Sequence, residues 1–196
     1  DWPTYRHDNL RSGFSDNRVG EKLAEKWTTK LEGKLSAVTL AENKLFVARV
    51  DAHEVVALHA ETGKELWRFT TGGRVDSPPS IRDGRAYFGS ADGWVYCLRT
   101  SDGALVWRFR AAPEDRRLMA YEQLESVWPV HGSVLIRENQ IYFVAGRSNF
   151  LDGGMRWFAL DALTGKKNIE VVLDDKEPGE EKSLQDRIQI LQMPVG

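Results

Sequence analysis

The chain has 196 residues, and 41% of them are hydrophobic, which predicts a folded domain with a sizeable core rather than a disordered polypeptide. A formal net charge of −2 gives no electrostatic basis for binding nucleic acid, which requires clustered cations. No stretch approaches the roughly 18 consecutive apolar residues of a membrane-spanning helix, so no membrane span is predicted.

A repeat follows a polar beginning. Residues 1–24 are polar and rich in turn formers, and we expect them to be an irregular segment. After them, tryptophans recur at intervals of 40 residues, at Trp27, Trp67 and Trp107. The turn glycines Gly63 and Gly103 keep the same interval, and Gly165 follows after 62 residues. A period of roughly 20–50 residues is typical of an array of repeated structural units.

Each unit reads as four short strands. In the second unit, runs of strand-forming residues at 77–81, 85–90, 94–99 and 104–109 are separated by turns that each contain Asp-Gly. Such pairs are strong hairpin signals, because glycine accepts the positive φ of tight turns. Four short strands in about forty residues are one propeller blade. The sequence therefore predicts an all-β partial propeller of four-stranded antiparallel blades, at about 36–70, 77–109 and 131–173.

Both ends of the array predict an incomplete ring. Glu25–Leu31 aligns with the fourth strand of a blade, but nothing before it supplies the other three strands. Residues 174–196 are expected to be a loop and the start of another blade, so that residues 25–196 form the propeller part of the chain. Open edges leave backbone groups unpaired, and we expect the remaining blades of a longer chain, or a second copy, to complete the ring. Short helices are predicted only at Met119–Glu125 and Glu180–Ile190.

Three copies of an eleven-residue motif, Ala-x-Asp-x-x-x-Gly-x-x-x-Trp, carry a family resemblance. Residues 57–67 match it except for His59, residues 97–107 keep only its glycine and tryptophan, and residues 159–169 have Ile169 in place of tryptophan. With the opening Trp2-Pro3-x-x-Arg6-x-Asp8 and Arg11-Ser12-Gly13, the chain resembles the pyrroloquinoline-quinone (PQQ)-like, or quinoprotein alcohol dehydrogenase-like, propeller repeats, whose rings usually have eight blades.

The motif has a packing role in such propellers. Its glycine closes a turn, and its indole covers the turn of the neighbouring blade, which buries on the order of 150–250 Å² of aromatic surface. We therefore interpret the motif residues as structural docking residues rather than catalytic ones: Gly63, Gly103, Gly165, Trp67 and Trp107.

The resemblance implies three functions. The family includes the scaffold lipoprotein of the outer-membrane assembly machinery, so the leading prediction is a non-catalytic, periplasmic module that binds a protein or another ligand. The alternative is part of a quinoprotein dehydrogenase that oxidises alcohols or sugars with PQQ and Ca²⁺. A second alternative is a propeller that binds or processes glycans.

The residues themselves supply little chemistry. The single cysteine, Cys97, excludes an adjacent cysteine pair and is expected to be a buried strand residue. The four histidines lack the spacing of a zinc site. We therefore expect no catalytic set, metal or cofactor in this chain, and PQQ with Ca²⁺ only if the remaining blades supply a site.

One rim is predicted to carry function, because long connections at 110–130 and 146–154 meet there. Its arginines suit an anionic or hydroxyl-rich ligand, and Trp128 suits stacking on a sugar. The alternative interpretation is that these are solvated loop charges, with Trp128 folded back as a plug. The candidate ligand-binding residues are Arg49, Arg74, Asp76, Arg116, Arg117, Trp128, Arg147 and Asn149, accompanied by Asp51, His53, Glu122 and Asp152.

Overall fold

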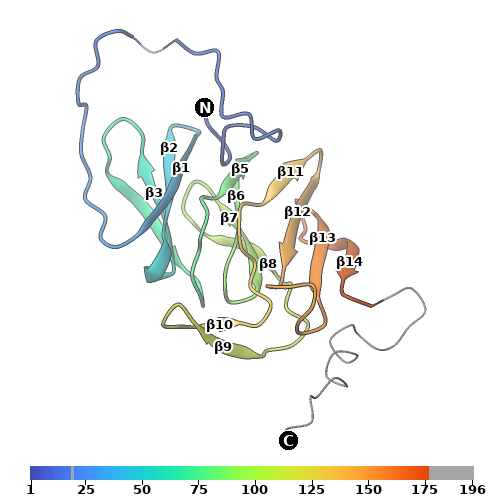
Figure 1. Cartoon of the computed structure of the whole chain (residues 1–196). Helices are drawn as coiled ribbons and strands as arrows, with labels where there is room; N and C mark the ends of the chain where they lie inside the picture. Colours follow the sequence, from blue (N-terminus) through green and yellow to red (C-terminus); the bar gives the residue numbers. More distant parts are fainter. Residues whose placement is uncertain (19, 177–196) are drawn as a thin grey trace, which may run out of the picture.

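The computed structural model describes residues 1–18 and 20–176, and its regular structure is almost all β (Figure 1). Three antiparallel sheets each contain four strands in chain order. Blade 1 consists of β1 (Leu35–Ala41), β2 (Lys44–Arg49), β3 (Glu54–His59) and β4 (Glu65–Thr70), with a 3₁₀ turn at Val50–Ala52. Blade 2 consists of β5 (Ser80–Arg82), β6 (Arg85–Gly89), β7 (Trp94–Arg99) and β8 (Leu105–Arg110). Blade 3 consists of β11 (Leu135–Arg137), β12 (Gln140–Ala145), β13 (Met155–Asp161) and β14 (Lys167–Leu173).

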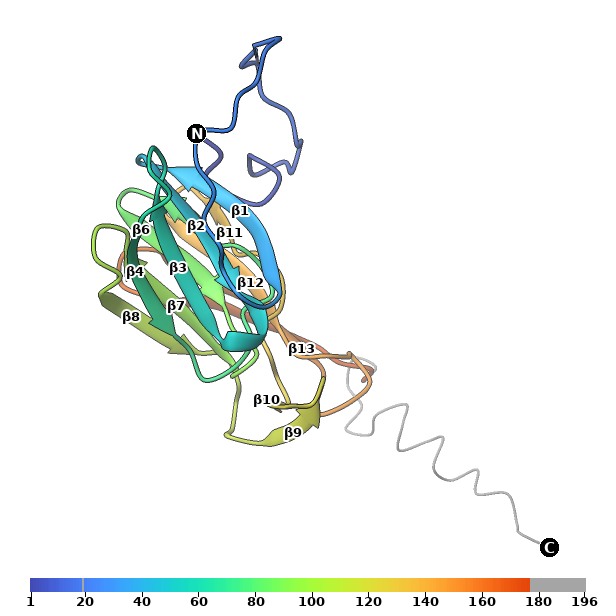
Figure 2. The same ribbon diagram turned by 90° about the vertical axis from the view of Figure 1, so that its left-hand side faces the viewer.

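The sheets are stacked face to face, which confirms the predicted partial propeller (Figure 2). One apolar cluster lies between blades 1 and 2, around Phe46, Phe88 and Leu98. A second lies between blades 2 and 3, around Phe143 and Phe158. Because blade 2 has a neighbour on both faces, Val95–Leu98 of β7 is buried without interruption, whereas β12 at the end of the stack alternates buried and half-buried residues.

The same tryptophan contact recurs between units. The Trp67 Nε1–H donates to the Thr100 carbonyl at 2.9 Å, and the Trp107 Nε1–H donates to the Ala162 carbonyl at 3.1 Å. Each indole covers a glycine with positive φ: a Cβ at Gly103 would lie 2.7 Å from the Trp67 ring, and one at Gly165 would lie 2.7 Å from the Trp107 ring. Only glycine therefore fits beneath these indoles.

Glu25–Leu31, predicted as a lone outer strand, has no sheet partner within the part of the chain that the structure describes, so its place in a blade stays a prediction. Their side chains nevertheless contact blade 1. The Trp27 Nε1–H donates to the Ala60 carbonyl at 2.9 Å, and Leu31 packs against the cluster that contains Val56. A strand is defined by its hydrogen-bonded neighbour, and the sequence repeat reports only the side-chain contact.

The predicted helix at Met119–Glu125 is wrong. These residues belong to a two-stranded hairpin, β9 (Arg117–Ala120) and β10 (Gln123–Ser126), in which Met119 lies opposite Leu124. Tyr121 and Glu122 form its turn, with φ of 50° and 62°. Turns of this kind usually contain Asn-Gly, and Tyr-Glu at this position is no hairpin signal. The helix predicted at Glu180–Ile190 and the predicted start of a further blade lie outside the described residues.

Replacing Trp67 by alanine tests the energetic weight of the indole contact. We expect Trp67→Ala to lower the free energy of unfolding by about 3–5 kcal/mol, because the truncation leaves a cavity over Gly103 and an unpaired Thr100 carbonyl. Urea unfolding followed by circular dichroism measures this loss. The neighbouring Leu66, 42% exposed, provides the control: Leu66→Ala should cost far less, and equal losses would contradict a special role for the indole.

Candidate functional site

The β9–β10 hairpin lies at one end of the stacked blades, and the N-terminal segment lies at the other end (Figure 1). It belongs to the connection between β8 and β11, which is the enlarged rim connection that the sequence predicts. Two backbone hydrogen bonds fix its base, from Ser126 N–H to the Ala91 carbonyl and from Val127 N–H to the Arg116 carbonyl. The hairpin is therefore anchored to blade 2 and reaches toward both neighbours.

Glu125 is the centre of an ion-pair network beneath the hairpin. Its side chain has no solvent exposure, and its two carboxylate oxygens accept from Arg74 Nε and Arg147 Nη2, each at 2.5 Å. Arg74 lies on the connection between blades 1 and 2, and Arg147 lies on the β12–β13 loop of blade 3. One buried carboxylate therefore joins elements of all three blades, with both of its oxygens paired, as a buried charge requires.

Arg74 extends the network to Asp76 and His131. Its Nη1 lies 3.3 Å from Asp76 Oδ1, and the other Asp76 oxygen pairs with His131. The hydrogen bond from His131 lowers the pKa of the Asp76 carboxyl below its ordinary value. The Arg74 guanidinium also lies 4.3 Å from the centre of the Tyr121 ring, at the tip of the hairpin.

Trp128 is part of a second, neighbouring cluster. Its side chain is only 3% exposed, the Arg116 guanidinium lies over the ring at 4.9 Å, and the Trp128 Nε1–H donates to the Asp152 carbonyl at 3.0 Å. Arg116 also pairs with the Asp152 carboxylate at 2.5 Å. The expectation that Trp128 offers a stacking surface to a sugar is therefore not met, because the ring is covered by the protein itself.

The remaining predicted rim residues do not join these clusters. Arg49 pairs with Glu54 at 2.5 Å inside blade 1, and Arg117 pairs with Asp115 at 3.1 Å on the surface. Asn149 is exposed and has no hydrogen-bond partner among residues 1–18 and 20–176. Of the eight candidates, the structure thus brings together Arg74, Asp76 and Arg147 in one cluster, and Arg116 with Trp128 in the other.

Sequence reasoning missed Glu125 and the surface of the hairpin. Met119, Tyr121 and Leu124 are 70%, 74% and 51% exposed, and Met119 and Leu124 lie side by side as cross-strand partners. His53 ties the hairpin to blade 1, through a 2.7 Å hydrogen bond between its Nε2 and Gln123 Oε1. The sequence holds no clear signal for this hairpin, because Leu118, Met119 and Ala120 are consecutive apolar residues without alternation, and no glycine marks the turn.

The described residues offer no ready site for a metal. They contain no group of three or more His, Cys, Asp or Glu side chains that could hold an ion. Cys97 is buried between blades 2 and 3, where burial raises the pKa of its thiol to about 12. No helix in the described part of the chain is long and apolar enough to cross a membrane.

Comparison with known proteins gives one family match. The model of the family described as outer membrane protein assembly factor BamB matches residues 15–189. The BamB of Shewanella oneidensis is 29% identical over 97 residues, which cover 50% of this chain and 24% of that protein. This chain thus spans about a quarter of the length of that curated relative.

Quinone-dependent dehydrogenases are also similar. The dehydrogenase subunit of the quinone alcohol dehydrogenase of Gluconobacter oxydans is 26% identical over 190 residues, covering 85% of this chain and 24% of that protein. The structure of a europium-containing methanol dehydrogenase aligns with a TM-score of 0.68 at 16% identity, over 90% of this chain and 32% of that one. At this identity the structural likeness establishes the fold alone.

Replacing Glu125 by glutamine tests the buried network. We expect Glu125→Gln to lower the free energy of unfolding by about 3–5 kcal/mol, because the buried Arg74 and the partly exposed Arg147 would lose the carboxylate that they share. Urea unfolding and trypsin cleavage at Arg116 and Arg117 report on the loosened hairpin. The exposed pair Arg99–Asp102 is the control: Asp102→Asn should cost about 0–1 kcal/mol. A Glu125→Gln loss as small as the control's would contradict the anchoring role.

Proposed function

The chain belongs to the family described as outer membrane protein assembly factor BamB, and on this premise we propose that it is a non-catalytic propeller module that serves as a protein-interaction scaffold. The proposal rests mainly on the rim hairpin. Apart from the exposed Glu122 at its turn, its charged groups have ion-pair partners among the described residues, whereas Met119, Tyr121 and Leu124 are exposed.

The chemistry of the hairpin suits contact with a protein. Protein interfaces are depleted of unpaired charge at their centre and enriched in Tyr, Met and Arg. Met119, Tyr121 and Leu124 supply such a surface, and the ion pairs beneath it leave little free charge to attract a small anion at this rim. A two-stranded hairpin is also marginally stable alone, so its anchoring by Glu125 supports a presented binding element.

The open faces of the blade stack support a larger ring. On blade 3, Ile169 and Val171 are 44% and 43% exposed, although the residues at the same register positions in blade 2, Trp107 and Phe109, pack against blade 3. We propose that the remaining blades of the same gene product, or a second copy, cover this face. The family membership further supports an extracytoplasmic, periplasmic location.

Photo-crosslinking tests the scaffold proposal. A photoreactive amino acid placed at Met119 or Leu124 of the full-length gene product, in its native cells, should give adducts with one protein that takes part in outer-membrane protein assembly. Asp83, which is exposed in the turn of the β5–β6 hairpin, is the matched control position. Absence of adducts at both hairpin positions, or equal adducts at Asp83, would contradict the proposal.

The dehydrogenase alternative is favoured by one observation, the similarity to the Gluconobacter subunit over 85% of this chain. The described residues do not fit its metal requirement, since they contain no acidic cluster for Ca²⁺. On the scaffold proposal, the full-length protein reconstituted with PQQ and Ca²⁺ should show no dye-linked oxidation of alcohols or sugars. Oxidation that requires both additions would overturn the scaffold proposal in favour of the enzyme.

A further inference from the structure

The N-terminal segment is bound to the innermost strand region of every blade. Trp2 exchanges two backbone hydrogen bonds with Leu40 of β1, at 2.6 and 2.9 Å. The Ile81 N–H of β5 donates to the Pro3 carbonyl at 2.7 Å, and Arg11 Nη2 donates to the Ser133 carbonyl, just before β11, at 3.4 Å. The opening motif of the sequence therefore lies across all three blades, at the end away from the rim hairpin (Figure 1).

Most polar groups of this segment have internal partners. Thr4 Oγ1 and Ser80 Oγ lie 2.9 Å apart, and Arg11 Nη1 donates to the Tyr5 carbonyl at 2.7 Å and to Thr4 Oγ1 at 3.0 Å. The Asp8 carboxylate accepts from both the backbone N–H and the hydroxyl of Ser12. These bonds explain why the segment holds its shape without regular structure.

Arg6 is the exception. Its guanidinium has no hydrogen bond or ion pair within the part of the chain that the structure describes. Its backbone is in the left-handed region, with φ of 57°, and that of His7 follows with φ of 78°. The Arg6 carbonyl accepts from the Gly13 N–H at 2.9 Å, and this hydrogen bond holds the turn. Two consecutive residues in this region without glycine are costly, and such strain is concentrated at binding sites.

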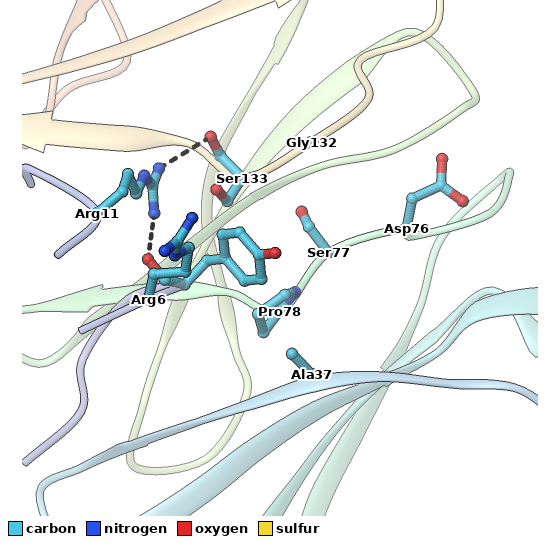
Figure 3. A pocket seen from close by; sticks show the side chains of 9 residues that line it. Arg6, Arg11, Ala37, Asp76, Ser77, Pro78, Gly132 and Ser133 are labelled. Carbon is cyan, nitrogen blue, oxygen red and sulfur yellow. Dashed lines mark hydrogen bonds between the residues drawn. The ribbon is translucent and has the colours of Figure 1, made fainter. Parts of the chain in front are cut away.

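Arg6 borders a cavity of about 510 Å³, which is lined by the N-terminal segment, by β1 and by the residues just before β5 and β11 (Figure 3). Ala37, Pro78 and Tyr5 also line the cavity. The hydroxyls of Tyr5, Ser77 and Ser133 have no hydrogen-bond partner among residues 1–18 and 20–176. The cavity thus combines one uncompensated cation, unused hydroxyls and an apolar wall.

The acidic residue that lines this cavity does not neutralise the Arg6 guanidinium. Asp76 lines the same cavity, but its two oxygens are paired with Arg74 and His131. Arg11, whose guanidinium is directed to carbonyls and to Thr4, lies over the Tyr5 ring at 5.9 Å and adds positive charge. The Asp8 carboxylate of the same segment opposes these two guanidinium groups, so Arg6, Arg11 and Asp8 together leave one net positive charge, which favours a singly charged anion.

We propose that this cavity binds a carboxylate. The planar guanidinium of Arg6 is its bidentate partner, and the hydroxyls of Ser77 and Ser133 are further contacts. A singly charged carboxylate matches the one uncompensated guanidinium better than a doubly charged phosphate does. The carboxylate belongs either to a small hydroxylated organic acid or to the C-terminus of a peptide. This site is independent of the rim hairpin and of the scaffold function.

Isothermal titration of the 196-residue chain tests the site with three probes: gluconate, a short peptide with a free C-terminus, and the same peptide amidated. Saturable binding of gluconate or of the free-acid peptide, but not of the amide, is the expected result. Binding of gluconate alone assigns the site to a free acid, and tighter binding of the peptide assigns it to a C-terminus. No binding of either carboxylate would overturn the proposal.

Variants then assign the binding to Arg6. Arg6→Gln should weaken it about 10-fold or more, because a charge-assisted bidentate contact is lost, and Arg6→Lys should retain part of it. Arg18→Gln is the control, since Arg18 is exposed on the same segment and does not line the cavity. Thermal melts of each variant establish folding. Folded Arg6→Gln protein with wild-type affinity would overturn the assignment.

Discussion

The contact between an indole and the glycine turn of the next sheet repeats along this chain, and the geometry of the blade stack follows from it. The indole N–H donates to the carbonyl of the fourth residue of the next eleven-residue motif. The ring occupies the space that any Cβ at the glycine of that motif would need. The contact therefore fixes both the distance between two sheets and their register. Since it recurs at Trp67 and Trp107, blades 1 and 2 and blades 2 and 3 are placed relative to each other in the same way, and Trp27 makes the same contact with blade 1 from outside the sheets.

Because the blades are placed in the same way, the connections between their strands meet at the same end of the stack. This brings together the residues of the rim network. Glu125 reaches Arg74 and Arg147 across 51 and 22 residues of sequence. A carboxylate without solvent exposure is costly unless it is paired, so the hairpin can settle only where both arginines are presented. The exposed apolar surface of the hairpin is thus a consequence of the blade stack, because an isolated hairpin of this length would not be stable.

The sequence was informative where interactions are local or periodic. The tryptophan interval and the Asp-Gly turns of blade 2 predicted the sheets, because glycine at positive φ is a local requirement. The hairpin was missed because Tyr121 and Glu122 occupy positive φ without the usual residues, and only tertiary contacts stabilise them there. Glu25–Leu31 was predicted as a strand from its tryptophan, but the hydrogen bonds of a strand depend on a partner that a side-chain repeat does not report. Whether the Arg6 guanidinium finds a partner depends on how the whole N-terminal segment folds, so it could not be predicted from the sequence.

Blade 3 shows how the repeat changes at its open face. Ile169 occupies the register position of Trp67 and Trp107, and an isoleucine can neither donate to a carbonyl nor cover a glycine turn as an indole does. An aromatic pair is present on the next two strands inward instead, where Tyr142 of β12 and Trp157 of β13 are stacked with their centroids 5.7 Å apart. A flat stacked pair offers dispersion and apolar burial without a fixed hydrogen-bond direction. On the proposal that a further blade covers this face, that blade is held by packing alone at the Ile169 position, and contacts from its own side must specify its register.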